Sequence, residues 1–252
     1  MVPSPSVEER LARQPEAIRG MFAAVAPRYD LLNRLLSLRQ DVRWRRRLVA
    51  ALAAAPPGRV LDLATGTGDV AFAIAGRPAF GADFCLDMLA LARTKARSGS
   101  APARARANAA ARRRPPGWTC ADGLALPFRP ASFAAVTVAF GVRNFADLAA
   151  GLAEIRRVLV DRGVLAILEF QRPRRRSIRL GMQLWNRLVV TPVGRLLSHD
   201  AAAYSYLPAS VATFPDAGEL GARVAAAGFG LESSRELSGG IVALTVARRE
   251  GA

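Results

Sequence analysis

The feature that most constrains the fold is the stretch 60–69, where a short apolar strand runs into a turn that contains Gly66 and Gly68. A helical pattern of apolar residues follows it, from Val70 to Ala75. Glycine lacks a Cβ and tolerates positive φ, so its backbone can approach a ligand closely. The free N–H groups of the first helical turn face the same place. This order of elements is typical of the nucleotide-like cofactor sites of open α/β sheets.

The spacing of this turn bears on the kind of cofactor. In the dinucleotide fingerprint G-x-G-x-x-G, the third glycine position falls on Ala71. Asp69 puts a negative charge where a pyrophosphate has to lie, which disfavours NAD. S-adenosylmethionine carries an ammonium and a sulfonium group and no phosphate, so it suits the turn better. A tight strand–helix turn without a ligand is the alternative interpretation.

Charge and cysteine content limit the function classes. The 252 residues include 36 Lys and Arg against 20 Asp and Glu, a net charge of +16. Lys95 is the single lysine, which is typical of a GC-rich coding bias, so the charge favours anionic partners without singling out nucleic acid. Cys85, Cys120 and His199 are too few for a zinc site of standard ligand number or for a disulfide framework.

Location follows from the same composition. The cysteine content predicts a reducing compartment, and we expect no bound metal. The N-terminus has no apolar run of the signal-peptide kind, and no stretch of about 18 uncharged apolar residues predicts a spanning helix. We therefore expect a cytoplasmic protein, with contact at the inner face of a membrane left open.

The hydrophobic pattern predicts one α/β domain. Residues 1–15 are expected to form a flexible arm and residues 16–250 the domain. Amphipathic helices at 16–54 either pack on the sheet or cover the cofactor site as a lid, and Ser37 is expected to cap the second of them. Further strands are predicted at 79–83, 118–121, 133–140, 164–170, 229–235 and 241–248, with helices beginning at 87, 147 and 215.

Polar residues follow three of the predicted strands. Asp83 lies where an acidic residue binds ribose hydroxyls in sheets of this kind. Asp122 either meets an adenine amino group or caps a turn. Arg143 either has a function or forms a surface salt bridge, and its place at the carboxyl edge of the sheet favours function.

Two basic segments have more than one interpretation. Residues 97–117 predict a flexible basic insertion, which is a solvated loop rather than a nucleic-acid-binding arm. Residues 172–200 combine an arginine run with apolar residues at helical spacing and Trp185. This segment lies on an anionic membrane, gates an apolar pocket, or faces the core with a solvated basic end.

Short motifs over nearly the whole chain, from about Met21 to Arg248, resemble the ubiquinone/menaquinone biosynthesis C-methyltransferase family. The N-terminal motif is Tyr29-Asp30-x-x-Asn33-x-x-x-Ser37-x-x-x-Asp41-x-x-Trp44. The others are Gly66-Thr67-Gly68-Asp69, Leu126-Pro127-Phe128, Phe140-Gly141-Val142-Arg143-Asn144, Arg157-Val158-Leu159, Leu168-Glu169-Phe170, Tyr204-x-Tyr206-Leu207-x-x-Ser210, Phe214-Pro215 and Gly239-Gly240. The chain departs from the family pattern at Leu32, at Ala139 and at 160–163.

The resemblance implies a class I methyltransferase, an α/β fold with a Rossmann-like sheet of seven strands and an N-terminal helical lid. It implies that S-adenosylmethionine is the cofactor. The predicted cofactor-binding residues are Asp62, Gly66, Thr67, Gly68, Asp83, Phe84, Asp122 and Gly123. The implied substrate is a polyprenyl hydroquinone. We favour methylation of demethylmenaquinol to menaquinol, and the 2-polyprenyl-6-methoxy-1,4-benzoquinol of ubiquinone synthesis is the alternative.

Ring-carbon methylation requires electron density at that carbon, which an ionised quinol hydroxyl supplies. We expect Arg143 to stabilise the oxyanion, directly or through a water that removes the ring proton. A guanidinium holds its proton too firmly to be a suitable base. Asn144 and Tyr29 are expected to hold the quinol oxygens, and residues 174–197 the prenyl tail.

Three other functions compete with this one. The net charge suggests a nucleic-acid methyltransferase, although the motif 140–144 offers no proline–aromatic pair for stacking a base, and we expect no nucleic-acid partner. A nicotinamide oxidoreductase is disfavoured by Asp69 and Ala71. A non-catalytic quinone-binding protein is disfavoured by the intact glycines and Arg143. Whether the chain forms a homodimer stays open.

Overall fold

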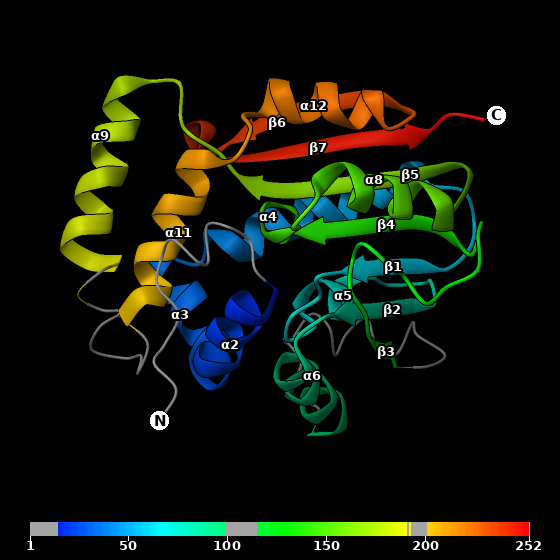
Figure 1. Ribbon diagram of the computed structural model, residues 1–252, viewed down its shortest axis with the longest axis horizontal. Coiled ribbons are helices and arrows are strands. Elements are labelled where there is room, and N and C mark those ends of the chain that lie inside the picture. The colour runs from blue at the N-terminus through cyan, green and yellow to red at the C-terminus, as the bar shows by residue number, and fades with distance from the viewer. Residues whose placement is uncertain (1–14, 99–114, 191, 193–200, 252) are drawn as a thin grey trace.

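A mixed sheet forms the centre of the molecule. The computed structural model describes residues 15–98, 115–190, 192 and 201–251, with the backbone alone at 201–205. Within these residues the sheet has seven strands in the order β3-β2-β1-β4-β5-β7-β6 (Figure 1). The strands are β1 (Val60–Leu63), β2 (Ala79–Asp83), β3 (Gly117–Cys120), β4 (Phe133–Ala139), β5 (Leu159–Phe170), β6 (Phe229–Leu237) and β7 (Val242–Arg249). Strand β7 runs antiparallel to both of its neighbours, and the other pairings are parallel.

Helices cover both faces of the sheet. They are α2 (Pro15–Val25), α3 (Tyr29–Leu36), α4 (Gln40–Ala51), α5 (Asp69–Ala73), α6 (Leu86–Ser98), α8 (Leu148–Val158), α9 (Arg176–Trp185), α11 (Ala201–Thr213) and α12 (Ala217–Ala226). Short helical turns are η1 (Ala26–Arg28), η2 (Leu52–Ala54), η3 (Val142–Asn144), η4 (Asn186–Val190) and η5 (Ser238–Gly240). One core cluster joins the sheet to α8 and α12, and a second joins its other face to α4 and α5.

Strands β1 and β4 lie at the centre and are buried on both faces. Every residue of β1 is buried, and so is β4 from Phe133 to Val138. Continuous apolar runs are what a parallel strand covered by helices requires. Asp62 and Thr137 are the buried polar exceptions in these two strands.

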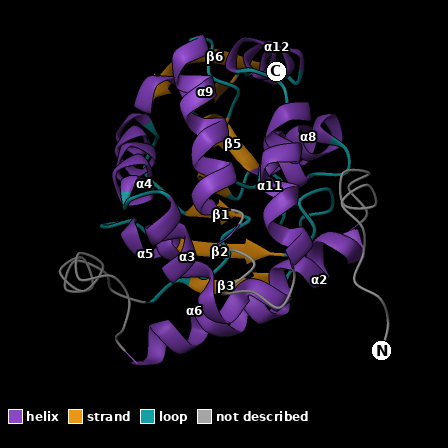
Figure 2. Ribbon diagram, turned by 90° about the vertical axis from the view of Figure 1, so that its left-hand side faces the viewer, coloured by secondary structure: helices purple, strands orange, loops and turns teal. Residues whose placement is uncertain are grey.

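The carboxyl ends of the parallel strands point toward one end of the molecule. Helices α2, α3, α9 and α11 gather at this end (Figures 1 and 2). Ligands of open α/β sheets bind outside the carboxyl ends of the strands, and most readily where neighbouring strands connect in opposite directions. In this sheet that point lies between β1 and β4, because the chain goes from β1 to β2 on one side and returns to β4 on the other.

All the predicted strands form, and three local details differ. Strand β5 begins at Leu159 instead of 164. Leu159 pairs with Phe133 and Val164 with Ala135, so residues 160–163 bulge out of the ladder, with Arg162 at φ 59°. The departure from the family pattern at 160–163 is therefore an interruption inside one strand.

The other two differences concern helix ends. Helix α5 stops at Ala73, because Ile74 is already extended and the chain must turn into β2. Ser37 is not the N-cap residue of α4. That position is Arg39, at φ 60°. The Ser37 hydroxyl still reaches the first turn of α4, where it accepts the Asp41 N–H at 3.4 Å and donates to the Asp41 carboxylate at 2.9 Å.

Parts of three predicted segments lie outside the described residues. These are 1–14 of the N-terminal arm, 99–114 of the basic insertion, and 191 and 193–200 of the segment 172–200. In the described part of the chain, no helix is both long and apolar enough to cross a membrane.

Gly68 allows a stringent test of the glycine turn. Its φ is 86°, and a Cβ there would lie 2.6 Å from Trp118 and 3.0 Å from Phe72. We expect Gly68→Ala to lower the free energy of unfolding by about 2–4 kcal/mol, because strain and overpacking add. Gly66→Ala is the matched control, since its φ is 55° and its Cβ would meet only Tyr29, at 3.9 Å. It should cost about 1 kcal/mol. Urea unfolding measures both, and equal losses would contradict the packing argument.

Candidate functional site

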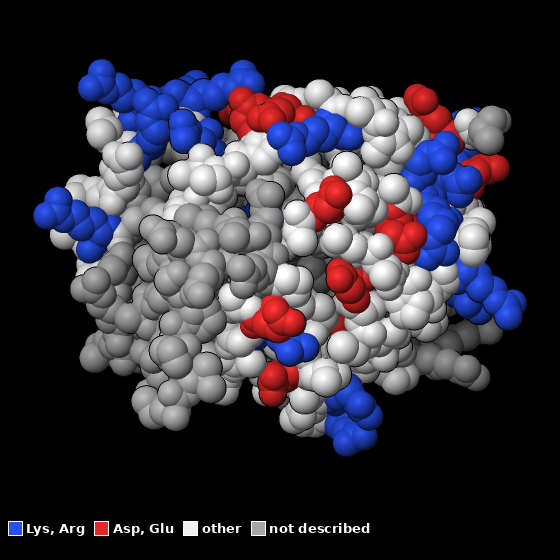
Figure 3. Space-filling view, in the orientation of Figure 1, with Lys and Arg blue, Asp and Glu red and all other residues white. Residues whose placement is uncertain are grey.

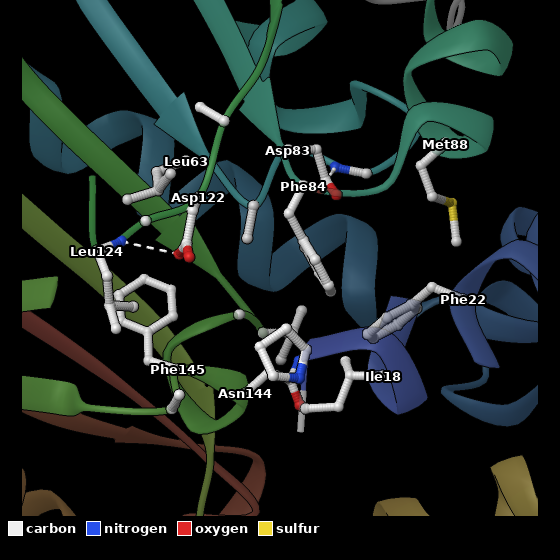
Figure 4. Close-up of a pocket in the computed structure, with 18 of the residues that line it drawn as sticks. Ile18, Phe22, Leu63, Asp83, Phe84, Met88, Asp122, Leu124, Asn144 and Phe145 are labelled. Atoms are coloured by element: carbon white, nitrogen blue, oxygen red, sulfur yellow. Dashed lines mark hydrogen bonds between the residues drawn. The ribbon is translucent and has the colours of Figure 1, made fainter. Parts of the chain in front are cut away.

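A cavity lies at the carboxyl ends of the central strands. The strand-end side of its wall comes from the segments that follow β1, β2, β3 and β4, and helix α2 supplies the opposite side. Figure 4 shows Asp83, Phe84 and Asp122 on the first side, facing Ile18 and Phe22 of α2. The wall also includes Tyr29, Leu63, Ala64, Gly66, Met88, Gly123, Leu124, Ala139, Phe140, Gly141, Asn144 and Phe145.

Asp83 joins the glycine turn to the end of β2. Its carboxylate accepts the Gly66 N–H at 2.7 Å and the Cys85 N–H at 2.9 Å. Burial raises the pKa of Asp83, and these N–H groups act in the opposite direction. Two carboxylate oxygens offer about four acceptor sites, so Asp83 keeps capacity for the hydroxyl groups of a ligand.

Asp62 lies beneath the turn, and it is not among the cavity-lining residues. Its side chain accepts from the Thr65 hydroxyl at 2.5 Å, the Ala71 N–H at 3.2 Å and the Thr137 hydroxyl at 2.8 Å. It thereby joins β1, the start of α5 and β4. Burial raises the pKa of Asp62 to about 6, although these hydrogen bonds work against the rise.

The backbone is strained where β1 and β4 end. Ala64 and Phe140 directly follow these strands and have φ of 54° and 60°. A Cβ on Gly141 would lie 2.4 Å from the Ala64 Cβ, so the two strand ends approach too closely for a side chain. Left-handed conformations of residues other than glycine cost about 1–2 kcal/mol and concentrate at functional sites. All three residues line the cavity.

An ionic network ties the N-terminal helices to the glycine turn. Asp30 of α3 accepts from the Thr67 hydroxyl at 2.6 Å and pairs with Lys95 of α6. Asp69 pairs with Lys95 at 3.2 Å and with Arg45 of α4 at 3.7 Å. Burial disfavours the charge on Asp69, but Arg45 and Lys95 outweigh it and hold its pKa below the usual value.

This network corrects one argument from the sequence. Asp69 was expected to repel a pyrophosphate, but it is paired with cations and is not among the cavity-lining residues. Its charge is therefore not a reason to disfavour a dinucleotide. Of the two residues that disfavoured NAD, Ala71 at the third glycine position of the fingerprint is the one that remains.

Tyr29 forms part of an aromatic wall. Its ring meets Phe22 edge-to-face with centroids 6.2 Å apart, and Phe22 meets Phe84 in the same manner at 6.5 Å. Burial raises the pKa of Tyr29, while Arg45 and Arg143 lower it. Because the pKa is raised overall, the Tyr29 hydroxyl stays protonated at neutral pH and can donate a hydrogen bond.

Arg143 is buried but is not among the cavity-lining residues. Its guanidinium pairs with Glu169 at 2.8 Å, donates to the Phe140 carbonyl and lies 5.7 Å from the centre of the Phe170 ring. Burial raises the pKa of Glu169, and Arg143 opposes the rise. A surface salt bridge was one interpretation of Arg143, but with 7% of the residue exposed this pair is internal.

Asn144 projects into the cavity between Phe145 and Ile18 (Figure 4). The buried Tyr206 of α11 donates its hydroxyl to the Asn144 amide oxygen at 2.8 Å. An amide has two N–H donors besides that oxygen, so Tyr206 fixes which end of the side chain remains for a ligand. Sequence reasoning did not assign Tyr206 to the site, although its motif carried the family resemblance.

The structure brings together most of the predicted site residues. Those that line the cavity are Tyr29, Gly66, Asp83, Phe84, Asp122, Gly123 and Asn144. Asp62, Thr67, Gly68 and Arg143 are not among the lining residues and lie behind them, holding the turn and the strand ends. Sequence reasoning missed the apolar part of the wall. Ile18, Phe22 and Met88 have a helical spacing that is equally typical of core residues, and Leu124 and Phe145 lie in loops without a periodic pattern.

Comparison with known proteins now identifies the family. The ubiE/COQ5 methyltransferase family matches residues 10–249. The chain belongs to this family. It is 44% identical to the demethylmenaquinone methyltransferase of Thermus thermophilus, over 91% of this chain and all of that protein. It is 40% identical to the ubiquinone/menaquinone biosynthesis C-methyltransferase UbiE of Geobacter sulfurreducens, over 93% of this chain and 89% of that protein.

Solved structures agree on the fold. Magnesium protoporphyrin IX methyltransferase from Synechocystis, with bound SAH, superposes with a TM-score of 0.61 over 94% of this chain and all of that one, at 16% identity. The [4+2]-cyclase SpnF gives the same TM-score over 94% of this chain and 96% of its own. The predicted class I fold is confirmed, and so is the prediction that this chain is a methyltransferase.

Asp62 predicts a pH dependence of stability. Because its folded pKa of about 6 exceeds the ordinary 3.8, the native state holds this proton more tightly, and the contribution of Asp62 falls as pH rises through that window. Asp62→Asn removes the titration but keeps the shape. Relative to the wild type, the variant should gain about 1 kcal/mol of unfolding free energy between pH 5 and pH 7. Urea unfolding at both pH values measures this difference, and a constant difference would contradict the raised pKa.

Proposed function

We propose that this enzyme methylates a ring carbon of demethylmenaquinol, giving menaquinol, with S-adenosylmethionine as the methyl donor. The observation that carries the substrate choice is similarity: the relatives from Thermus thermophilus and Deinococcus radiodurans, each 44% identical, are both named demethylmenaquinone methyltransferase. Methylation of the methoxy-benzoquinol in ubiquinone synthesis is the second candidate. It is supported by the 40% identical relatives whose names include both pathways.

The donor set of the cavity fits S-adenosylmethionine. Asp83 offers buried carboxylate oxygens to the ribose hydroxyls, as acids at the end of β2 do in such sheets. Asp122 accepts the Leu124 N–H at 2.9 Å through one oxygen, and its other oxygen can accept the adenine amino group. Phe84 gives an apolar face beside them, and Gly66 leaves room for close approach of the ligand.

The bound cofactor supplies an electrophilic methyl group on a sulfonium. The protein has to align the acceptor carbon with it and stabilise negative charge on the quinol oxygen that activates that carbon. The Tyr29 hydroxyl and the Asn144 amide line the cavity and can donate to such an oxygen. As the new carbon–carbon bond forms, the S–CH3 bond would break and leave a neutral thioether, and the methylated ring carbon would lose its proton to water or a base, which restores the aromatic ring.

Arg143 acts in this proposal as a positioning residue. It holds the Phe140 carbonyl and, through Glu169, the end of β5, so it fixes the loop that carries Asn144. The sequence predicted a contact with the oxyanion, directly or through a water, whereas the role proposed here is indirect, because Arg143 is not among the cavity-lining residues. For the first part of the prenyl tail the proposal assigns the apolar wall from α2, with Ile18 and Phe22, and a role for residues 174–197 stays a prediction.

A methyl-transfer assay tests the substrate assignment. The enzyme receives S-adenosylmethionine labelled in the methyl group and is offered demethylmenaquinol or the methoxy-benzoquinol, each kept reduced. We expect label in menaquinol, with kcat/KM at least about tenfold higher than for the benzoquinol. The reverse preference would support the second candidate. Transfer to neither quinol, with the cofactor still bound, would overturn the quinol assignment.

The Arg143–Glu169 pair gives a second test. Arg143→Ala leaves Glu169 buried without its cation, so we expect it to lower the free energy of unfolding by about 3–5 kcal/mol. The double variant Arg143→Met, Glu169→Gln removes both charges and should recover most of that loss. Its turnover should remain at least about tenfold below the wild type, because the Asn144 loop is no longer fixed, while the cofactor Kd changes little. If turnover recovers together with stability, Arg143 serves the fold alone.

A further inference from the structure

Two helices expose stripes of leucine side chains to solvent. On α9 and η4 the stripe has a spacing of four residues, and its members Leu180, Leu184 and Leu188 are 54%, 58% and 62% exposed. On α3 and just beyond it, Leu31, Leu35 and Leu38 are 63%, 48% and 68% exposed. Elsewhere in the described residues, Leu86 and Leu231 are the large apolar side chains exposed to this degree. The exposed leucines are thus concentrated on one pair of helices.

These two helices pack against each other, although about 150 residues separate them in the sequence. The Trp185 indole N–H donates to the Leu36 carbonyl at 3.2 Å. Leu32 and Val190 are buried in the seam between the helices, with Leu36 and Trp185 beside them. The inner sides of both helices are therefore used for packing, and the leucine stripes belong to their outer sides.

The two leucine-bearing segments themselves carry charge of one sign, although Arg174 pairs with Glu236 of β6 beside them. Residues 172–190 contain six arginines and no acidic residue, and residues 31–39 contain two arginines and no acidic residue. Figure 3 shows Lys and Arg side chains gathered at the upper left and left edge, where α9 stands in Figure 1. Arg175, Arg176 and Arg187 are exposed. Exposed leucine beside arginine, without acid, is the pattern of helices that lie in a membrane interface.

The leucine-bearing helices lie at the end of the molecule that holds the cavity. Figure 2 views this end directly and shows α9, α3 and α2 on it. Helix α2 carries Ile18 and Phe22 of the cavity wall. A partner that binds to the leucine-bearing helices would therefore lie next to α2, which forms part of the cavity wall.

We propose that α3 and the α9–η4 segment form a docking surface for an anionic lipid bilayer. The leucines enter the boundary between head groups and acyl chains, and the arginines pair with lipid phosphates. A symmetric dimer through the same surface would bring arginines against arginines, and the one acidic residue of α3, Asp30, is already paired with Lys95. The charge therefore favours lipid over a second copy. The inference does not depend on the quinol assignment, because its test contains neither quinol nor cofactor.

Co-sedimentation of the full chain with vesicles tests the proposal. We expect binding to vesicles of equal parts phosphatidylglycerol and phosphatidylcholine, weak binding to pure phosphatidylcholine, and release as salt is raised. We expect the partition coefficient to fall at least tenfold, to about a tenth or less, in the triple variant Leu180→Gln, Leu184→Gln, Leu188→Gln. The matched control, Leu86→Gln with Leu231→Gln, removes leucines exposed elsewhere and should leave it unchanged.

A charge reversal separates the electrostatic part. Arg175→Glu with Arg176→Glu should weaken binding at least about tenfold. Arg129→Glu is the control, because Arg129 is exposed in the loop before β4, at the opposite end of the sheet. Thermal unfolding should show that all variants keep the wild-type melting temperature within a few degrees.

Three results would overturn the proposal. The first is a wild-type chain that binds neither kind of vesicle. The second is binding that falls equally in the leucine variant and its control. The third is a stable dimer by light scattering that the leucine variant converts to monomer without loss of vesicle binding, which would make the stripes an interface between copies.

Discussion

The site depends on one buried carboxylate. Asp62 sits in the central strand β1, and its three hydrogen-bond donors come from the glycine turn, from the start of α5 and from β4. A buried carboxylate without such partners would be costly, so the turn has to close over it with Thr65 and Ala71 in place. When the turn closes in this way, the Gly66 N–H donates to Asp83, and the turn forms part of the cavity wall. The Asp62 carboxylate therefore acts through the hydrogen bonds that hold the turn in place.

A second layer of contacts brings the N-terminal helices to this turn. Asp30 lies on α3 and Asp69 on α5, and Lys95 of α6 forms an ion pair with each of them. The helices supply Phe22 and Tyr29 to the cavity and, on the far side, expose leucines. Such additions are where function is decided, since the same sheet also occurs in a [4+2]-cyclase.

The sequence was sufficient for the sheet and for the residues at the strand ends, because strand periodicity and the glycine spacing are local signals. It could not tell which way a strand-end side chain turns. Asp62 and Arg143 both lie beside the site, but their partners Thr137 and Glu169 come from other strands and draw them behind the cavity wall. The sequence also could not predict that α2 lines the cavity, because Ile18 and Phe22 have the helical spacing of core residues.

The network at the turn has a practical consequence, because Lys95 is the single lysine among 252 residues. A reagent that modifies primary amines has one side-chain target in the whole chain, and this target bridges the N-terminal helices and the glycine turn. Its ammonium is held by two carboxylates, so modification requires those contacts to open. The rate of labelling at Lys95 therefore reports how often its ion pairs with Asp30 of α3 and Asp69 of α5 are broken. The native chain thus carries a reporter of these contacts without any engineered probe.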